Sequence, residues 1–340
     1  MNRNHIVTAC APGKVILSGE HAVVCGKPAL GLAVNRFATT SITEESGYGI
    51  WFEFLNDGLK YVSTLQELKI LKTKVAKRYR KFTAGKCYIK DVIYSPLELI
   101  QYAFIYLVEN LFLPVERGLK IQVELTLPVG CGMGASSAVI LSLIHALVNY
   151  FDHTLTVDKY LYFGREIENL QHGRSSGLDL FLSFHGGYHF FASGNAHKRN
   201  LPNIPLVLVN TGAAETSTGE CVEQIAKYLQ DDVLVNSFMQ VTRNMDLALQ
   251  QNNVAMLADN IRKNHELLNK IGVVPWKVAD FIAAIEARGN VAKVSGAGAI
   301  RGNQAGIVLV VGGREISDIV MKYGYEILPI QGEANGLRLI

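Results

Sequence analysis

Residues 127–140, LPVGCGMGASSAVI, place three glycines at alternate positions directly before a continuous apolar run. Three glycines in five residues weaken a helix or strand, because glycine loses more conformational freedom on folding than any other residue. The preceding residues 119–127 alternate strictly between apolar and polar side chains, which predicts a strand with one buried face. Residues 135–149 are too long and too apolar for a strand and predict a buried helix. A strand, a glycine-rich turn and a helix N-terminus therefore follow one another.

This arrangement predicts an anion site. The free N–H groups of a helix N-terminus and the helix dipole favour negative charge, and glycines let the backbone approach an anion without Cβ clashes. The candidate phosphate-binding residues are Gly130, Gly132, Gly134, Ala135, Ser136 and Ser137. The loop is neither a Walker A loop nor a GxGxxG fingerprint, because the residues that define those motifs are absent. A tight structural turn is the alternative interpretation.

The composition limits the class of protein. A chain of 340 residues with 49% hydrophobic and 19% charged residues is typical of a globular enzyme of two domains. A net charge of +3 is too small to indicate nucleic acid. The five cysteines are odd in number and form no CxxC pair, which favours a reducing compartment. No apolar stretch reaches the ~18 residues of a membrane span and no signal peptide begins the chain. We therefore expect a cytoplasmic protein that does not bind a membrane.

Helices and strands alternate through the rest of the chain. The predicted helices cover residues 157–171, 218–230, 234–270 and 275–288, and the predicted strands cover residues 184–194, 204–212, 291–296 and 305–312. The polar segment 190–205 contains glycine and proline and is the predicted boundary between a domain of residues 1–195 and a domain of residues 196–340. Residues 69–90 carry nine Lys or Arg and no acid. A solvated helix face is the favoured interpretation of this basic segment, with contact to phosphates or a partner as the alternative.

Two further stretches change the interpretation of the glycine loop. They are APGKVILSGEHAVVCGKPAL at 11–30 and AKVSGAGAIRGNQAGIVLVV at 292–311. Together with the glycine loop they resemble the three signature motifs of the GHMP kinases, a family that includes galactokinase, homoserine kinase, mevalonate kinase and phosphomevalonate kinase. The segments ENLQHGRSSGLD at 168–179 and KNHELLNKIGV at 263–273 are also similar to the family pattern. Within the family, the GEHAVV of the first motif is most similar to mevalonate kinase.

The resemblance implies a two-domain α+β fold with the nucleotide and the substrate in the cleft between the domains. It also implies ATP and Mg²⁺ as cofactors and a small-molecule alcohol as the acceptor. Mevalonate, phosphorylated on its primary hydroxyl in isoprenoid synthesis, is the expected acceptor. A phosphomevalonate kinase or a sugar kinase is the alternative within the family, and a nucleotide-binding regulator without catalysis is the alternative outside enzymes. A homodimer is expected by analogy alone.

The family pattern also implies roles for single residues. Asp179 matches the group that accepts the hydroxyl proton, with Lys14 nearby. Ser136 and Glu168 match the Mg²⁺ ligands; without the resemblance they would be a helix N-cap and a surface acid. Glu166 competes with Glu168, but the eleven-residue spacing to Asp179 favours Glu168. The residues expected to bind the substrate are Glu20, His21, Thr218, Gly296 and Ala297. His21 is expected to donate a hydrogen bond to the substrate, with a structural histidine as the alternative.

Two positions depart from the family pattern. Thr216 stands where the family has the arginine of an Arg-Ser-Thr stretch beside the substrate. The family arginine that would recognise a substrate carboxylate is therefore missing. The third motif begins with Gly-Ala-Gly at residues 296–298 but is then longer and contains Arg301. Arg301 either contacts a phosphate or a carboxylate, or faces water.

Overall fold

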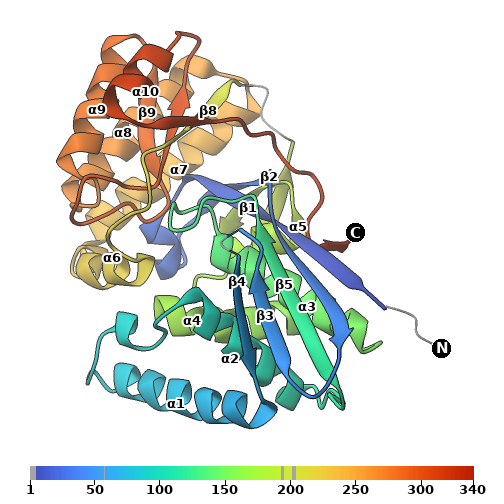
Figure 1. Cartoon of the computed structure of the whole chain (residues 1–340). Coiled ribbons are helices and arrows are strands. Elements are labelled where there is room, and N and C mark those ends of the chain that lie inside the picture. Colours follow the sequence, from blue (N-terminus) through green and yellow to red (C-terminus); the bar gives the residue numbers. More distant parts are fainter. Residues whose placement is uncertain (1–4, 57, 193–194, 201–203) are drawn as a thin grey trace.

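The computed structural model describes residues 5–56, 58–192, 195–200 and 204–340. In this part of the chain the strands form one eight-stranded sheet and one four-stranded sheet, and helices pack against both. The predicted α+β class is confirmed. In Figure 1 the helices α8, α9 and α10 lie in the upper part beside the second sheet, whereas α1, α2 and α4 lie below, beside the first sheet.

The first sheet has the order β12-β1-β2-β5-β3-β4, with β6 paired to β2 and β7 paired to β6. Its strands are β1 (Val7–Ser18), β2 (Ala29–Glu45), β3 (Ile50–Phe54), β4 (Leu59–Ser63), β5 (Gly118–Leu125), β6 (Tyr188–Ala192), β7 (Asn195–Arg199) and β12 (Arg338–Leu339). Residues 119–125 of the alternating segment form a strand, as predicted, whereas residues 126–127 lie beyond its end. The last strand, β12, pairs with β1 through Ala9 and Cys10, so the C-terminal end of the chain returns to the first sheet.

The first sheet is covered by helices of the N-terminal half. They are α1 (Leu65–Thr83), α2 (Pro96–Asn110), α3 (Ala135–Tyr150), α4 (Val157–His172) and α5 (Leu178–His185), and short 3-10 turns lie at η1 (His21–Cys25) and η2 (Ile89–Asp91). Helix α3 packs against β1 and β2. Eleven of its sixteen residues are buried, which explains why its sequence is apolar on all sides. The polar Ser142 within it is satisfied by the hydroxyl of Thr40 on β2, at 2.8 Å.

The second sheet has the order β11-β8-β10-β9. Its strands are β8 (Leu206–Asn210), β9 (Val291–Ser295), β10 (Ile307–Val311) and β11 (Glu326–Leu328). The associated helices are α6 (Thr218–Ile225), η3 (Tyr228–Gln230), α7 (Asp232–Gln250), α8 (Val254–Lys270), α9 (Trp276–Ala287) and α10 (Ser317–Tyr323). Strands β9 and β10 are buried along their whole length. This is expected of β10, which is a continuous apolar run, whereas β9 also buries Lys293 and Ser295.

The predicted continuous helix over residues 234–270 is wrong, because the structure has two helices in this segment. Helix α7 ends at Gln250 and α8 begins at Val254. Between them Asn252 adopts a left-handed conformation with φ 51°, which asparagine tolerates better than most residues. The side chain of Asn253 then accepts a hydrogen bond from the Met256 amide at 3.0 Å and caps α8.

The position of the domain boundary stays a prediction. Part of the proposed boundary, residues 193–194 and 201–203, lies outside the described residues. Strand β7 follows residue 194 and still pairs with β6 of the first sheet. The larger hydrophobic core also includes side chains of the C-terminal half, such as Met245 and Leu309.

Much of the basic segment 69–90 lies on α1. Two of its cations, Lys72 and Arg78, form ion pairs with Glu109 and Glu98 of α2 and so fasten the two helices together. Among the described residues, the structure contains no helix with the length and apolar character needed to cross a membrane.

Candidate active site

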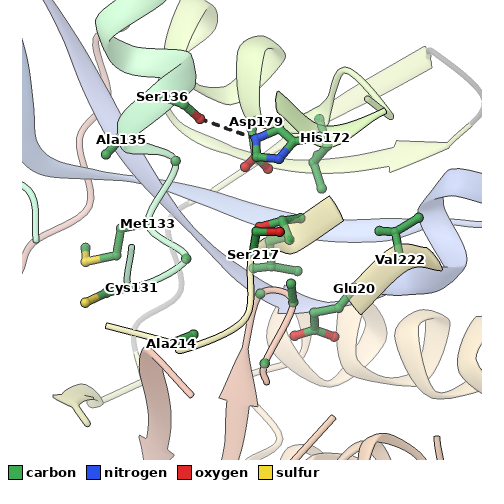
Figure 2. Close-up of a pocket in the computed structure, with 18 of the residues that line it drawn as sticks. Glu20, Cys131, Met133, Ala135, Ser136, His172, Asp179, Ala214, Ser217 and Val222 are labelled. Carbon is green, nitrogen blue, oxygen red and sulfur yellow. Dashed lines mark hydrogen bonds between the residues drawn. The ribbon is translucent and has the colours of Figure 1, made fainter. Parts of the chain in front are cut away.

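A cavity of about 310 Å³ is lined by all three sequence motifs. It lies where β1, the glycine loop, the α4–α5 connection, the start of α6 and the end of β9 meet. The predicted site residues that line it are Lys14, Glu20, His21, Gly130, Gly132, Gly134, Ala135, Ser136, Glu168, Asp179, Thr218, Gly296 and Ala297. Figure 2 shows Ser136 and His172 directed toward each other. Ser137 is fully buried behind this wall.

The glycine loop requires its glycines for conformational reasons. Gly130, Gly132 and Gly134 all have left-handed φ values, of 73°, 79° and 72°, which residues other than glycine rarely adopt. Gly134 is the N-cap of α3, and a Cβ at this position would lie 3.0 Å from Cγ of Lys14. The loop therefore presents its backbone and the first turn of α3 to the cavity without side-chain obstruction.

Lys14 connects the glycine loop to Asp179. Its ammonium group lies 3.0 Å from Oδ2 of Asp179 and donates a hydrogen bond to the Gly132 carbonyl, also at 3.0 Å. The Lys14 side chain is 3% exposed and that of Asp179 is 31% exposed. The lysine is thus fixed in the wall, whereas the carboxylate at the start of α5 remains accessible from the cavity.

Glu168 is a buried carboxylate near the C-terminal end of α4. Its two oxygens accept hydrogen bonds from the hydroxyls of Ser137 and Ser175. Burial raises the pKa of Glu168, and the charge of Asp179 adds to this effect, while His172 and the two serine hydroxyls oppose it. The negative charge on Glu168 is therefore incompletely compensated by the protein.

Ser136 and Ser137 have different surroundings. The Ser136 hydroxyl lies 3.5 Å from Nε2 of His172, whereas Ser137 is the residue that donates to Glu168. The sequence paired Ser136 with Glu168 and did not single out His172 or Ser175. His172 and Ser175 lie in the segment ENLQHGRSSGLD, which is similar to the family pattern, but the pattern gives no role to these two side chains.

The oxygen donors around Glu168 fit a hard divalent cation. Mg²⁺ prefers carboxylate and hydroxyl oxygens and usually keeps waters or phosphate oxygens as further ligands. Burial raises the pKa of Glu168, so the ionised carboxylate is unfavourable in the protein alone, and a bound cation would stabilise it. The described part of the chain contains no group of three or more His, Cys, Asp or Glu placed to hold a metal. A Mg²⁺ ion bound here would complete its ligand set with water or phosphate oxygens.

Glu20 forms an ion pair that the sequence analysis missed. Its Oε1 accepts a hydrogen bond from the Lys293 ammonium group on β9, and the two side chains are 1% and 0% exposed. Burial lowers the pKa of Lys293, and the Glu20 carboxylate opposes that shift. The other Glu20 oxygen, Oε2, is buried and has no hydrogen-bond partner among the described residues. Lys293 lies within the third motif, but no spacing rule connects it to Glu20.

His21 is neutral and already hydrogen-bonded. Its Nε2 lies 3.1 Å from the Ala297 carbonyl, which can only accept, so Nε2 carries the hydrogen. Burial lowers the pKa of His21 to about 4. The neutral ring therefore offers an acceptor at Nδ1. Donation to the substrate, as the sequence analysis expected, is not available from the neutral ring in this arrangement.

The two residues that depart from the family pattern, Thr216 and Arg301, both have partners within the protein. Thr216 is buried and accepts a hydrogen bond from the Ile300 amide at 3.2 Å. Arg301 pairs with Glu220 at 3.0 Å and does not line the cavity. None of the residues 69–90 lines the cavity either. Arg174, which the sequence analysis did not single out, is exposed and does line it.

Comparison with known proteins is consistent with this site. The family model for the GHMP kinases N terminal domain matches residues 98–187. Mevalonate kinases of Thermococcus sibiricus and Pyrococcus horikoshii are 27% and 28% identical over 305 residues, which is 86% of this chain and 86% of each relative. The crystal structure of Methanococcus jannaschii mevalonate kinase matches with a TM-score of 0.76 and 22% identity, covering 97% of this chain and 99% of that one. Lactococcus lactis galactokinase in complex with galactose matches with a TM-score of 0.74 and 13% identity, covering 98% and 95%.

The fold and the three motifs around one cavity define a small-molecule kinase, and the chain belongs to the GHMP kinase family. It is a phosphotransferase with an alcohol acceptor and is similar to mevalonate kinases. GHMP kinases use ATP. The family membership predicted from the three motifs is confirmed.

Replacing His21 with Gln should make the protein less sensitive to acid. Since burial lowers the folded-state pKa of His21 from 6.5 to about 4, the unfolded chain binds a proton in this interval that the folded chain does not. Stability is therefore lost as the pH falls from about 6.5 to about 4, and the share due to His21 approaches about 3 kcal/mol. The measurement is the thermal unfolding midpoint of both proteins between pH 7 and pH 4.

His265 provides a matched comparison for this prediction. Burial also lowers its pKa to about 4, but it does not line the cavity. His265→Gln should likewise weaken the dependence of the unfolding midpoint on pH between pH 7 and pH 4, without changing the KM for the acceptor. Parallel stability profiles for wild type and His21→Gln would show that His21 does not contribute to acid sensitivity.

Proposed function

We propose that this protein transfers the γ-phosphoryl group of ATP to the primary hydroxyl of mevalonate, giving 5-phosphomevalonate and ADP. The observation that carries the proposal is the Lys14–Asp179 pair, which joins the glycine loop to an accessible carboxylate within one cavity. The similarity to archaeal mevalonate kinases supports the choice of acceptor. We further propose that ATP and the acceptor meet between domains formed by residues 1–195 and 196–340.

The glycine loop is the proposed binding site of the ATP phosphates. The residues are Gly130, Gly132, Gly134, Ala135, Ser136 and Ser137. Phosphoryl transfer requires cancellation of phosphate charge and an acceptor held in line with the phosphorus. The loop backbone and the amides of the first turn of α3 supply donors and a positive dipole. Lys14 on β1, whose ammonium group donates to the Gly132 carbonyl, adds a full positive charge.

Ser136 and Glu168 are the proposed protein ligands of Mg²⁺. When bound, the ion neutralises phosphate charge and fixes the phosphate geometry. Glu168 supplies the charged oxygen, and Ser136 supplies a hydroxyl at the helix N-terminus. Ser137 and Ser175 keep the Glu168 carboxylate in one orientation through their hydrogen bonds.

Asp179 and Lys14 are the proposed catalytic residues. The accessible carboxylate of Asp179 accepts or orients the proton of the acceptor hydroxyl. Lys14 lies between this carboxylate and the glycine loop, so its charge faces the space where the transferred phosphoryl group would pass. The remainder of the acceptor is proposed to contact Glu20, His21, Thr218, Gly296 and Ala297, which line the same cavity.

The alternatives from the sequence are less well supported. A phosphomevalonate kinase needs additional cations for a second phosphate, and the two sources expected from the sequence, Arg301 and the basic segment 69–90, lie outside the cavity lining. Besides Lys14, Arg174 is the lysine or arginine among the described residues that lines it. An inactive regulator has no need of the Lys14–Asp179 contact, and this contact is formed.

An acceptor panel tests the proposed reaction. ADP release is measured with mevalonate, phosphomevalonate, galactose and homoserine at saturating ATP and Mg²⁺. We expect mevalonate to give the highest kcat/KM, by about 100-fold or more over the others, since a site built around hydrogen bonds rejects unmatched polar groups strongly. Activity on galactose without activity on mevalonate would reject the proposal. ATP binding with no turnover of any acceptor would favour the regulator.

Asp179→Asn should reduce kcat by about 100-fold or more, because it removes the proton acceptor while preserving side-chain shape. The KM for ATP should stay within about threefold, since the glycine loop holds the phosphates independently. Steady-state kinetics with ATP and mevalonate provide the measurement. A variant with near wild-type kcat would mean that another group, with Glu20 as the nearest candidate, receives the proton.

Glu168→Gln should lower activity in a manner that depends on Mg²⁺. The amide keeps the hydrogen-bonding shape but loses the charge, so the Mg²⁺ concentration for half-maximal activity should rise by about tenfold or more. Excess Mg²⁺ should restore part of the rate, which it should not do for Asp179→Asn. Glu166→Gln is the matched control, because Glu166 is exposed on the same helix and does not line the cavity. An unchanged Mg²⁺ dependence in Glu168→Gln would remove Glu168 from the metal site.

A further inference from the structure

One arginine that lines the cavity has no compensating charge among the described residues. Of those residues, two lysine or arginine side chains line the cavity, Lys14 and Arg174. Lys14 is paired with Asp179. Arg174 has no carboxylate partner within residues 5–56, 58–192, 195–200 and 204–340, and its side chain makes no hydrogen bond there. Arginine stays charged at any physiological pH, so this group presents a permanent positive charge to a ligand.

The backbone on both sides of Arg174 is fixed. Gly173 is held by α1, because its carbonyl accepts a hydrogen bond from the Tyr79 hydroxyl at 3.3 Å and the Phe82 ring packs against it. Ser175 is held by α4, because its amide donates to Oδ1 of Asn169 at 2.8 Å and its hydroxyl donates to Glu168. The connection that carries Arg174 is therefore anchored, and only the long side chain must be ordered when a ligand binds.

The other cationic positions near the third motif do not serve the cavity. Thr216, which replaces the family arginine, is buried and uses its hydroxyl to accept from the Ile300 amide. Arg301 is engaged with Glu220 outside the lining. Glu20 and Asp179 already engage Lys293 and Lys14, so among the described residues that line the cavity Arg174 is the cation left to meet an acceptor carboxylate.

We propose that Arg174 binds the carboxylate of the acceptor and thereby selects hydroxy acids over neutral alcohols. This inference rests on the proposed function and names the specificity residue of the same site. The planar guanidinium matches a carboxylate through two parallel hydrogen bonds. Arg174 stands five residues before Asp179 on one connection, so the acid end and the reacting hydroxyl of one small molecule are held by the same segment. The ATP phosphates already have the glycine loop, the α3 N-terminus and Lys14.

The test compares mevalonate with its neutral amide in the wild-type protein, Arg174→Gln and Arg301→Gln. In Arg174→Gln we expect the KM for mevalonate to rise by about 10-fold to 100-fold, which is the loss expected for a hydrogen-bonded charge pair. The kcat should stay within about threefold and the KM for ATP within about twofold, since neither depends on the carboxylate. The amide should be used equally by Arg174→Gln and the wild type. Arg301→Gln should match the wild type with both acceptors.

The outcomes separate this inference from the proposed function. If the wild type phosphorylates mevalonate and Arg174→Gln raises the KM for ATP instead, the guanidinium serves the phosphates and the inference is overturned. An Arg174→Gln enzyme with unchanged constants overturns it as well. If the wild type uses galactose or the amide but not mevalonate, the proposed function fails and the inference falls with it. Because Arg174 is exposed and unpaired, thermal unfolding should confirm that the variant is folded.

Discussion

The buried ion pair between Glu20 and Lys293 joins the two sheets at the wall of the cavity. Glu20 follows β1 of the first sheet and Lys293 lies on β9 of the second. Removing one partner of such a pair leaves an uncompensated buried charge and costs about 3–5 kcal/mol. The neighbouring Ser295 reinforces the junction, because its hydroxyl accepts from the Ile16 amide and donates to the Ile16 carbonyl, at 3.2 and 2.9 Å. The geometry of the site therefore depends on contacts between segments that are far apart in sequence.

The same junction explains part of the glycine content of two motifs. A Cβ on Gly132 would lie 3.3 Å from the Ser295 carbonyl oxygen, and one on Gly306 would lie 2.4 Å from the Cys131 carbonyl oxygen. The glycine loop is thus packed against the backbone of the third motif. Glycine is needed here for close packing of two backbones as well as for access of an anion. A change in the third motif would for this reason also affect the phosphate loop.

Local patterns predicted the elements that carry the site, but they did not predict its side-chain pairs. The helices predicted at 135–149 and 157–171 agree with α3 and α4 within one residue at each end, because each has an unambiguous apolar pattern and a clear start. The break within 234–270 was missed because it depends on one left-handed residue, Asn252, between two helices of similar periodicity. The Glu20–Lys293 and Ser137–Glu168 pairs are made by the tertiary fold, across 273 and 31 residues, and no spacing rule reports them.

The charges around the cavity are balanced except at two places. Asp179 is compensated by Lys14 and Glu20 by Lys293. Within the described part of the chain, Glu168 has only hydroxyls as direct hydrogen-bond partners, and burial raises its pKa. Arg174 has the opposite imbalance, since among the described residues it has no acid. One end of the α4–α5 connection therefore favours a cation and the middle favours an anion. A divalent ion accompanied by phosphates and an acidic acceptor would together satisfy both imbalances, the cation at Glu168 and the acid at Arg174.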